Sequence, residues 1–218
     1  MTNYLNHGLS ERNWNKNVII CIHYLNRVEE TLIFYKTNSH PMERIELSPF
    51  QVARETLEVM LKTGLLMVTV DEKGKPNAMT IGWGFIGYIW TKPVFIVAVR
   101  PSRYTYTLVE KTGDFTVNVP VKGMEKAVEL CGTVSGRDVD KFKECNFTPI
   151  ASKYVKAPII GECAIGFECR AMYKQDLISE ALTKEVVSLC YPKGDYHRLY
   201  FGEILRVTAY RNYRELIL

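Results

Sequence analysis

"LLMVTVDEKGKPNAMTIGWGFIGYIWTKPVFIVAV" (residues 65–99) alternates short runs rich in β-branched and aromatic residues with turns of a few residues. The runs cover residues 65–71, 77–83, 84–90 and 92–99, and "EKGKP" supplies the first turn. β-Branched and aromatic residues favour strands, whereas glycine and proline favour the turns between them. Parallel neighbours need a long crossover, so strands joined this closely are expected to pair antiparallel.

Further strand patterns follow this stretch. "DFTVNVP" (residues 114–120) returns to a β-rich run, and three extended segments are expected near the C-terminus, over residues 163–176, 184–194 and 197–211. A doubly wound parallel sheet needs a helix after nearly every strand, and this chain lacks them. Six or more short strands at near-regular spacing, with only a few helices, predict a mainly β fold and a closed or nearly closed antiparallel barrel.

A few segments carry helical signals. Ser48 and Gln51 have the spacing of a capping box, and apolar residues recur at helical spacing from there until Gly64. A second helix is expected to open at Ser102 and close at Gly113, and a third covers "MEKAVELCG" (residues 124–132).

The first 41 residues have a different composition from the rest of the chain. They contain three of the four histidines and no glycine after Gly8, and Met42 stands just before the first helix signal. We therefore divide the chain into an N-terminal extension (residues 1–41) and one domain (residues 42–218). Translation from Met42 and an arm that packs on a partner subunit are both open explanations for the extension.

Composition excludes several classes of protein. The net charge is +4, but lysine and arginine are interspersed with acidic residues, which argues against nucleic acid as a partner. The longest apolar runs are far shorter than the roughly 18 residues of a membrane-spanning helix, so no membrane association is expected. The start lacks a secretory pattern, so the cytoplasm is the expected location. The six cysteines form no CxxC pair, so a metal site is not expected. They are expected to be reduced and mostly buried thiols.

The junction "VRPSRYTY" (residues 99–106) gathers positive charge and hydrogen-bond donors. Pro101 disfavours helix at Arg100, so a strand is expected to end there, and the free amides of the following helix form an anion site. Arg100 and Arg103 add charge, and the Ser102 and Thr105 hydroxyls add donors. A phosphate offers more acceptor oxygens than a carboxylate and suits this set better. The alternative is a solvated helix start whose arginines pair with nearby acidic residues.

Two other stretches could contact a ligand. In "PNAMTIGWGF" (residues 76–85) the glycines allow close approach of a backbone or a flat ligand, and Trp83 could cover an aromatic ring. The alternative is an ordinary edge strand in which the glycines relieve local strain and bind no ligand. "CGTVSGRDVDKF" (residues 131–142) offers loop amides and the fixed charges of Arg137 and Asp138, although an ordinary surface loop would look the same.

Five motifs in order resemble the flavin reductase-like family with the FMN-binding split-barrel fold, and more closely its flavoredoxin-like branch. They are "NAMTIGW", "RPSRYTY", "FTVNVP", "CGTVSGRDVDKF" and "HRLYFGEI", and the resemblance covers about residues 44–211. It implies a homodimer with FMN near the subunit interface. The FMN-binding residues it implies are Asn77, Ala78, Met79, Thr80, Trp83, Arg100, Ser102, Arg103, Tyr104, Thr105, Gly132, Ser135, Arg137 and Asp138.

The resemblance also implies a function. His197 is expected beside the flavin and the incoming nicotinamide as the catalytic residue, and Arg137 is the candidate cation near the flavin N1. The chain is then an NAD(P)H-dependent, flavin reductase-like oxidoreductase, with NAD(P)H as a transient co-substrate or a protein as donor. A free flavin, a metal complex or a redox protein partner would accept the electrons. Two alternatives are a non-enzymatic FMN-binding electron carrier without nicotinamide activity and a basic barrel that binds single-stranded nucleic acid.

Overall fold

The computed structural model describes residues 43–217. The predicted N-terminal extension and the predicted start at Met42 lie outside these residues. Among the helices of the described part, none is long and apolar enough to cross a membrane.

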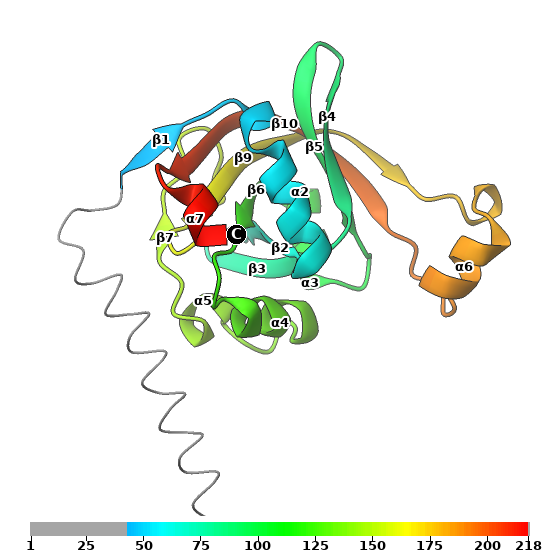
Figure 1. Cartoon of the computed structure of the whole chain (residues 1–218). Helices are drawn as coiled ribbons and strands as arrows, with labels where there is room; N and C mark the ends of the chain where they lie inside the picture. The colour runs from blue at the N-terminus through cyan, green and yellow to red at the C-terminus, as the bar shows by residue number, and fades with distance from the viewer. Residues whose placement is uncertain (1–42, 218) are drawn as a thin grey trace, which may run out of the picture. The chain divides into compact units, whose positions relative to one another are not determined.

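One eight-stranded antiparallel sheet forms the body of the protein (Figure 1). Its strands run in the order β3-β2-β6-β9-β10-β5-β4, and β1 pairs with the second half of β10. The predicted mainly β, antiparallel fold is confirmed. The strands are β1 (Arg44–Glu46), β2 (Leu65–Val70), β3 (Pro76–Ile81), β4 (Gly84–Ile89), β5 (Lys92–Val99), β6 (Asp114–Val119), β9 (Ile165–Asp176) and β10 (Arg198–Tyr210), and a separate pair is formed by β7 (Pro149–Ile150) and β8 (Ile159–Ile160).

The two end strands of the sheet, β3 and β4, are consecutive in the sequence. Only Gly82 and Trp83 separate them, and the Ala98 amide of β5 donates to the Trp83 carbonyl over 3.2 Å. At Gly84, a Cβ atom would lie 2.4 Å from the Ile96 carbonyl oxygen, so glycine permits this close approach. The sheet therefore curls until its ends meet through one bent segment, although no ladder joins β3 to β4.

Several helices pack against strands of the sheet. The capping-box residues were predicted to start the first helix, but the structure has a 3₁₀ turn there, η1 (Pro49–Gln51), with the Gln51 side chain accepting from the Ser48 amide over 2.8 Å. Helix α2 (Ala53–Lys62) follows; Thr63 is its C-cap residue, and Gly64 after it adopts φ 91°. The other helical elements are α3 (Tyr104–Thr112), α4 (Glu125–Thr133), α5 (Lys141–Glu144), η2 (Ser179–Ala181), α6 (Lys184–Cys190) and α7 (Tyr213–Ile217).

One predicted strand is wrong. Residues 184–194 were expected to be extended, but Lys184–Cys190 form helix α6, which Figure 1 shows beyond the ends of β9 and β10. The Thr183 hydroxyl accepts from the Val186 amide and caps this helix. Val186 and Leu189 are exposed, so their side chains do not join the sheet. The two consecutive valines, at positions 186 and 187, suggested a strand, but the Thr183 cap stabilises a helix.

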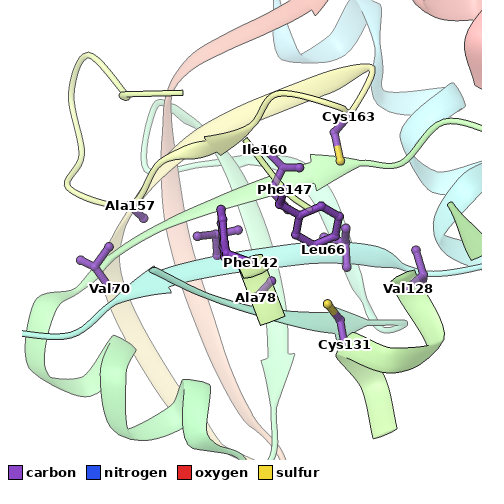
Figure 2. Packing of buried hydrophobic residues seen from close by; sticks show 11 residues of the cluster. Leu66, Val70, Ala78, Val128, Cys131, Phe142, Phe147, Ala157, Ile160 and Cys163 are labelled. Carbon is purple, nitrogen blue, oxygen red and sulfur yellow. The ribbon is translucent and has the colours of Figure 1, made fainter. Parts of the chain in front are cut away.

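A buried cluster fixes α4 and α5 against β2 and β3. Leu66 and Ala78 from these strands pack against Val128 and Cys131 of α4 and Phe142 of α5 (Figure 2). These residues are at most 7% exposed. Because the loop between the two helices carries several predicted ligand-binding residues, this packing positions that loop beside β3.

Candidate functional site

An open cleft of about 190 Å³ lies where β3, the end of β5 and the start of β10 meet. This volume is below the roughly 300–1,000 Å³ typical of sites for drug-sized ligands, so these residues enclose only part of such a ligand. The lining residues are Met79, Thr80, Ile81, Gly82, Trp83, Ala98, Arg100, Arg103 and His197. Six of the predicted site residues thus border the same space.

Strand β3 forms one wall of the cleft. It pairs only with β2, so alternate peptide groups along its other edge have no partner within the sheet. The side chains of Asn77, Ala78 and Met79 are buried, and the Thr80 hydroxyl donates to the Val128 carbonyl of α4. The structure therefore makes the backbone of this strand, rather than its side chains, available to a ligand.

Three predicted motifs meet at Asn77. Its side-chain amide donates to the buried Thr105 hydroxyl of α3 over 3.0 Å. A Cβ atom at Gly136 would lie 1.9 Å from the Asn77 Oδ1 atom and 3.0 Å from the Tyr104 ring. Glycine at position 136 therefore allows the loop after α4 to lie against both β3 and the start of α3.

Arg100 and Ser102 bind the protein itself. The Arg100 guanidinium donates to the carbonyls of Cys190 and Asp195, each over 3.0 Å, and lies 5.1 Å from the centre of the Tyr191 ring. The amide and hydroxyl of Ser102 both donate to the Asp195 carboxylate, over 3.2 and 2.6 Å. The prediction that Ser102 caps α3 is wrong, because the N-cap residue is Arg103. The donors of both residues hold the segment before β10 in place.

Arg103 and Arg137 form the exposed positive part of the site. Arg103 donates to the Gly132 carbonyl over 3.2 Å. Arg137 donates to the Ser102 carbonyl over 3.4 Å, and its guanidinium lies 5.1 Å from the centre of the Tyr104 ring. Both arginines stand next to the first turn of α3, where backbone amides lack intrahelical partners. The charge, the amides and the accessibility together make this the part of the site best suited to an anion.

The loop after α4 completes that side of the site. A Cβ atom at Gly132 would lie 3.3 Å from the Thr80 Cβ atom, so the loop starts close to β3. The Arg137 amide donates to the Ser135 hydroxyl over 3.2 Å, and the Asp138 amide donates to the Ser135 carbonyl over 3.1 Å. These turns hold the loop in a defined conformation beside Arg103.

His197 lies at the other side of the cleft, between two aromatic residues. Its ring centre is 4.8 Å from that of Trp83, and its Nδ1 atom is 2.8 Å from the Tyr191 hydroxyl. Burial, reinforced by the nearby Arg100 guanidinium, lowers the pKa of His197 to about 4. Burial also raises the pKa of the Tyr191 hydroxyl. At neutral pH this pair is therefore an uncharged imidazole and an uncharged phenol.

The sequence motifs did not include Tyr191 and Asp195. Both lie in "CYPKGDYH" (residues 190–197), a turn-rich stretch between α6 and β10. Tyr191 stacks on Tyr196 with ring centres 4.8 Å apart, and Asp195 has φ 58°. The only local signal was the density of glycine, proline and aromatic residues just before a histidine. Within the part of the chain that the structure describes, no cluster of metal-ligating side chains accompanies them.

Known proteins are similar to this chain in both sequence and fold. The model of the flavin reductase like domain matches residues 59–217. An uncharacterized protein of Archaeoglobus fulgidus is 36% identical over 148 residues, which are 68% of this chain and 72% of that protein. Flavoredoxin from Methanosarcina acetivorans is 28% identical with a TM-score of 0.55, and the match covers 68% of this chain and 69% of that one.

A more distant protein with a split-barrel domain, from Shewanella frigidimarina, supports the fold. It is 18% identical with a TM-score of 0.57, and the match covers 76% of each chain. The predicted split-barrel architecture is thereby confirmed. Since the family model spans most of the chain, the protein belongs to the flavin reductase-like family.

Proposed function

We propose that this protein binds FMN in the cleft and works as an NAD(P)H-dependent oxidoreductase. The supporting observation is the convergence of an edge strand, the exposed Arg103 and a buried neutral histidine around one cleft, with Arg137 beside the adjoining first turn of α3. These features match the parts of FMN: a flat heteroaromatic ring, a dianionic phosphate and a reactive ring edge. The similarity to flavoredoxins supports the same cofactor.

The phosphate fits beside Arg103 and Arg137. Two guanidinium groups and the free amides of the first turn of α3 offer donors at one accessible place. Arg100 and Ser102 are less suited than the sequence suggested, because Asp195 and backbone carbonyls already occupy their donors. Thr105 is also less suited, since its buried hydroxyl accepts from Asn77.

The ring system fits along β3. The unpaired peptide edge of residues 77–80 can bind ring heteroatoms, and the half-exposed indole of Trp83 can cover an aromatic face. When bound, FMN supplies the ring that accepts a hydride, so the protein needs no nucleophile and no carboxylate pair.

His197 is proposed as the catalytic residue that borders the reacting atoms. With the Tyr191 hydroxyl donating to Nδ1, the neutral imidazole carries its proton on Nε2 and can donate from there into the cleft. Tyr191 then acts as a positioning residue that fixes this tautomer. The Trp83 indole packs against the imidazole and contributes to its burial.

An absorbance spectrum of purified protein loaded with FMN, recorded anaerobically before and after NADH or NADPH, tests this function. We expect flavin bands that bleach with at least one nucleotide. A protein that cannot take up FMN would refute the cofactor and therefore the whole proposal.

A non-enzymatic electron carrier is the second candidate. Flavoredoxin of Desulfovibrio vulgaris (Miyazaki F) is 25% identical to this chain with a TM-score of 0.54, over 67% of this chain and 68% of that one. A carrier would retain FMN and would be reduced by dithionite, yet its spectrum would not change with NADH or NADPH. That outcome would favour a redox protein as electron donor.

A homodimer is proposed as the working assembly. The cleft is smaller than a typical small-molecule site, so a second copy could supply further walls. Tyr88, Trp90 and Tyr173 on the β4–β5 hairpin and β9 are 66%, 50% and 44% exposed, which suits an apolar interface. Light scattering on the eluted protein should give twice the chain mass of 25.1 kDa. A monomer that still binds FMN would exclude the dimer without affecting the cofactor assignment.

Replacing Arg103 by alanine is expected to weaken FMN binding by about 10- to 100-fold. A hydrogen bond to a charged group contributes about 1.5–3 kcal/mol, and each 1.4 kcal/mol is about tenfold in Kd. Fluorescence titration with FMN measures the change. Arg54→Ala is the matched control, because Arg54 lies on α2 and pairs only with Glu58 among the described ion pairs. Equal Kd values for both variants would show that the phosphate binds elsewhere.

A further inference from the structure

Two cysteines differ from the other thiols of the described chain. Cys131, at the end of α4, is buried, and Cys145, directly after α5, is half-buried and packs against the cluster that contains Cys131. Lys141 links the two residues, because its Nζ atom donates to the Cys131 carbonyl over 2.8 Å and its carbonyl accepts from the Cys145 amide over 3.0 Å. Each thiol affects the pKa of the other. Cys163 and Cys169 are instead fully buried, and burial raises the pKa of both. Among these thiols, only the first two form a neighbouring pair in which one member, Cys145, is accessible to solvent.

A buried lysine stands beside this pair. Lys141 is 4% exposed, and its Nζ atom donates to the Cys131 carbonyl oxygen over 2.8 Å. A lysine is rarely buried, because burial disfavours its charge and lowers its pKa. Its positive charge acts on the Cys145 thiol. Nothing in the proposed flavin chemistry uses this amine.

The environment makes the two thiols unequal. Interaction with the Cys131 thiol, together with the charge of Lys141, lowers the pKa of Cys145. Interaction with Cys145 and burial raise the pKa of Cys131. Thiolates are the nucleophilic form of cysteine, and oxidation-sensitive cysteines are typically accessible, of low pKa and next to a second, resolving cysteine. Cys145 is therefore the oxidation-sensitive cysteine, and Cys131 is the resolving cysteine.

We propose that Cys145 and Cys131 form a reversible dithiol–disulfide pair that is oxidised by hydroperoxides. The Cys145 thiolate attacks a peroxide oxygen; the S–O bond forms, the O–O bond breaks, and the released alkoxide or hydroxide takes a proton. The Cys131 thiol then attacks the sulfenic sulfur; the S–S bond forms, the S–O bond breaks, and water leaves. Two thiols lose two electrons, which reduce the peroxide.

The bond would close the segment between α4 and α5. Residues 132–144 lie between the two cysteines and include the loop of Gly132, Gly136 and Arg137 beside β3. Arg103 and Lys141 bind the carbonyls of Gly132 and Cys131, so the crosslink would form next to the part of the site best suited to an anion. The inference stands on the thiols alone and does not depend on the proposed flavin function.

Hydrogen peroxide, added to the reduced full-length protein, tests the pair. Mass spectrometry of peptides over a time course should show a Cys131–Cys145 crosslink that dithiothreitol reverses. Cys190 is the internal control, because it is also half-buried but lies on α6. We expect Cys145 to react about tenfold faster or more, since the thiolate is the reacting form. Equal rates for the two residues would overturn the proposal.

Variants separate the two roles. Cys145→Ser should abolish the crosslink and leave Cys131 reduced, whereas Cys190→Ser should change neither. Cys131→Ser should leave a sulfenic acid on Cys145 that dimedone traps. If loss of this buried side chain prevents folding, the wild-type time course still decides: oxidation of Cys145 to sulfinic acid without a bond to Cys131 would refute the pair.

Discussion

Alanine at Gly136 is expected to destabilise the protein by about 2–4 kcal/mol, through overpacking and a broken buried hydrogen bond, and to weaken FMN binding at least tenfold. The new Cβ atom would lie 1.9 Å from the Asn77 Oδ1 atom, far inside contact distance. Asn77 cannot simply turn away, because its amide binds Thr105 and both residues are buried. The loop must then lift from β3, which moves Arg137 away from the start of α3.

Urea denaturation and FMN titration measure the two effects separately. Gly87→Ala is the matched control, because no atom lies within 4 Å of its added Cβ and Gly87 lies on β4. Lower stability with unchanged FMN affinity would mean that the loop after α4 is not part of the cofactor site. Unchanged stability would mean that Asn77 moves more freely than its contacts indicate.

Local signals predicted the first half of the fold well. The strands β2 to β5 follow from short turns and strand-forming residues, which act within a few positions. Strand β1 was not predicted, because three residues at 44–46 become a strand only by pairing with β10, more than 160 positions later. Helix α6 was mistaken for a strand because valines suggested one, while the Thr183 cap and exposure of the segment decided otherwise.

The candidate site was only partly predictable for a similar reason. Arg103 lies beside the first turn of α3, within the motif that suggested an anion site. Arg137, which the resemblance assigned to the flavin N1, lies beside the same turn. Arg100 and Ser102 belong to the same motif as Arg103, but their partner Asp195 lies 93 positions after Ser102. Sequence spacing shows which groups can donate, yet it does not show which acceptors a distant turn will bring to them.

His197 provides the second large expected effect, through the dependence of stability on pH. The pKa of His197 in the folded protein is about 4, whereas an unperturbed histidine titrates near pH 6.5. Between these values the unfolded chain binds a proton that the folded protein excludes. The free energy of unfolding therefore falls as pH decreases from about 6.5 toward 4.

Between pH 7 and pH 5, the wild type is expected to lose about 2 kcal/mol more stability than His197→Gln, which cannot titrate there. Urea denaturation at both pH values measures the difference. Tyr191→Phe is the control, because it removes the hydroxyl that contacts Nδ1 but keeps the imidazole beside Trp83 and Arg100. It should retain most of the pH dependence, since burial is the main cause of the low pKa. Equal pH dependence in wild type and His197→Gln would mean that folding does not lower the pKa of His197, and the buried environment assigned to this imidazole would then be wrong.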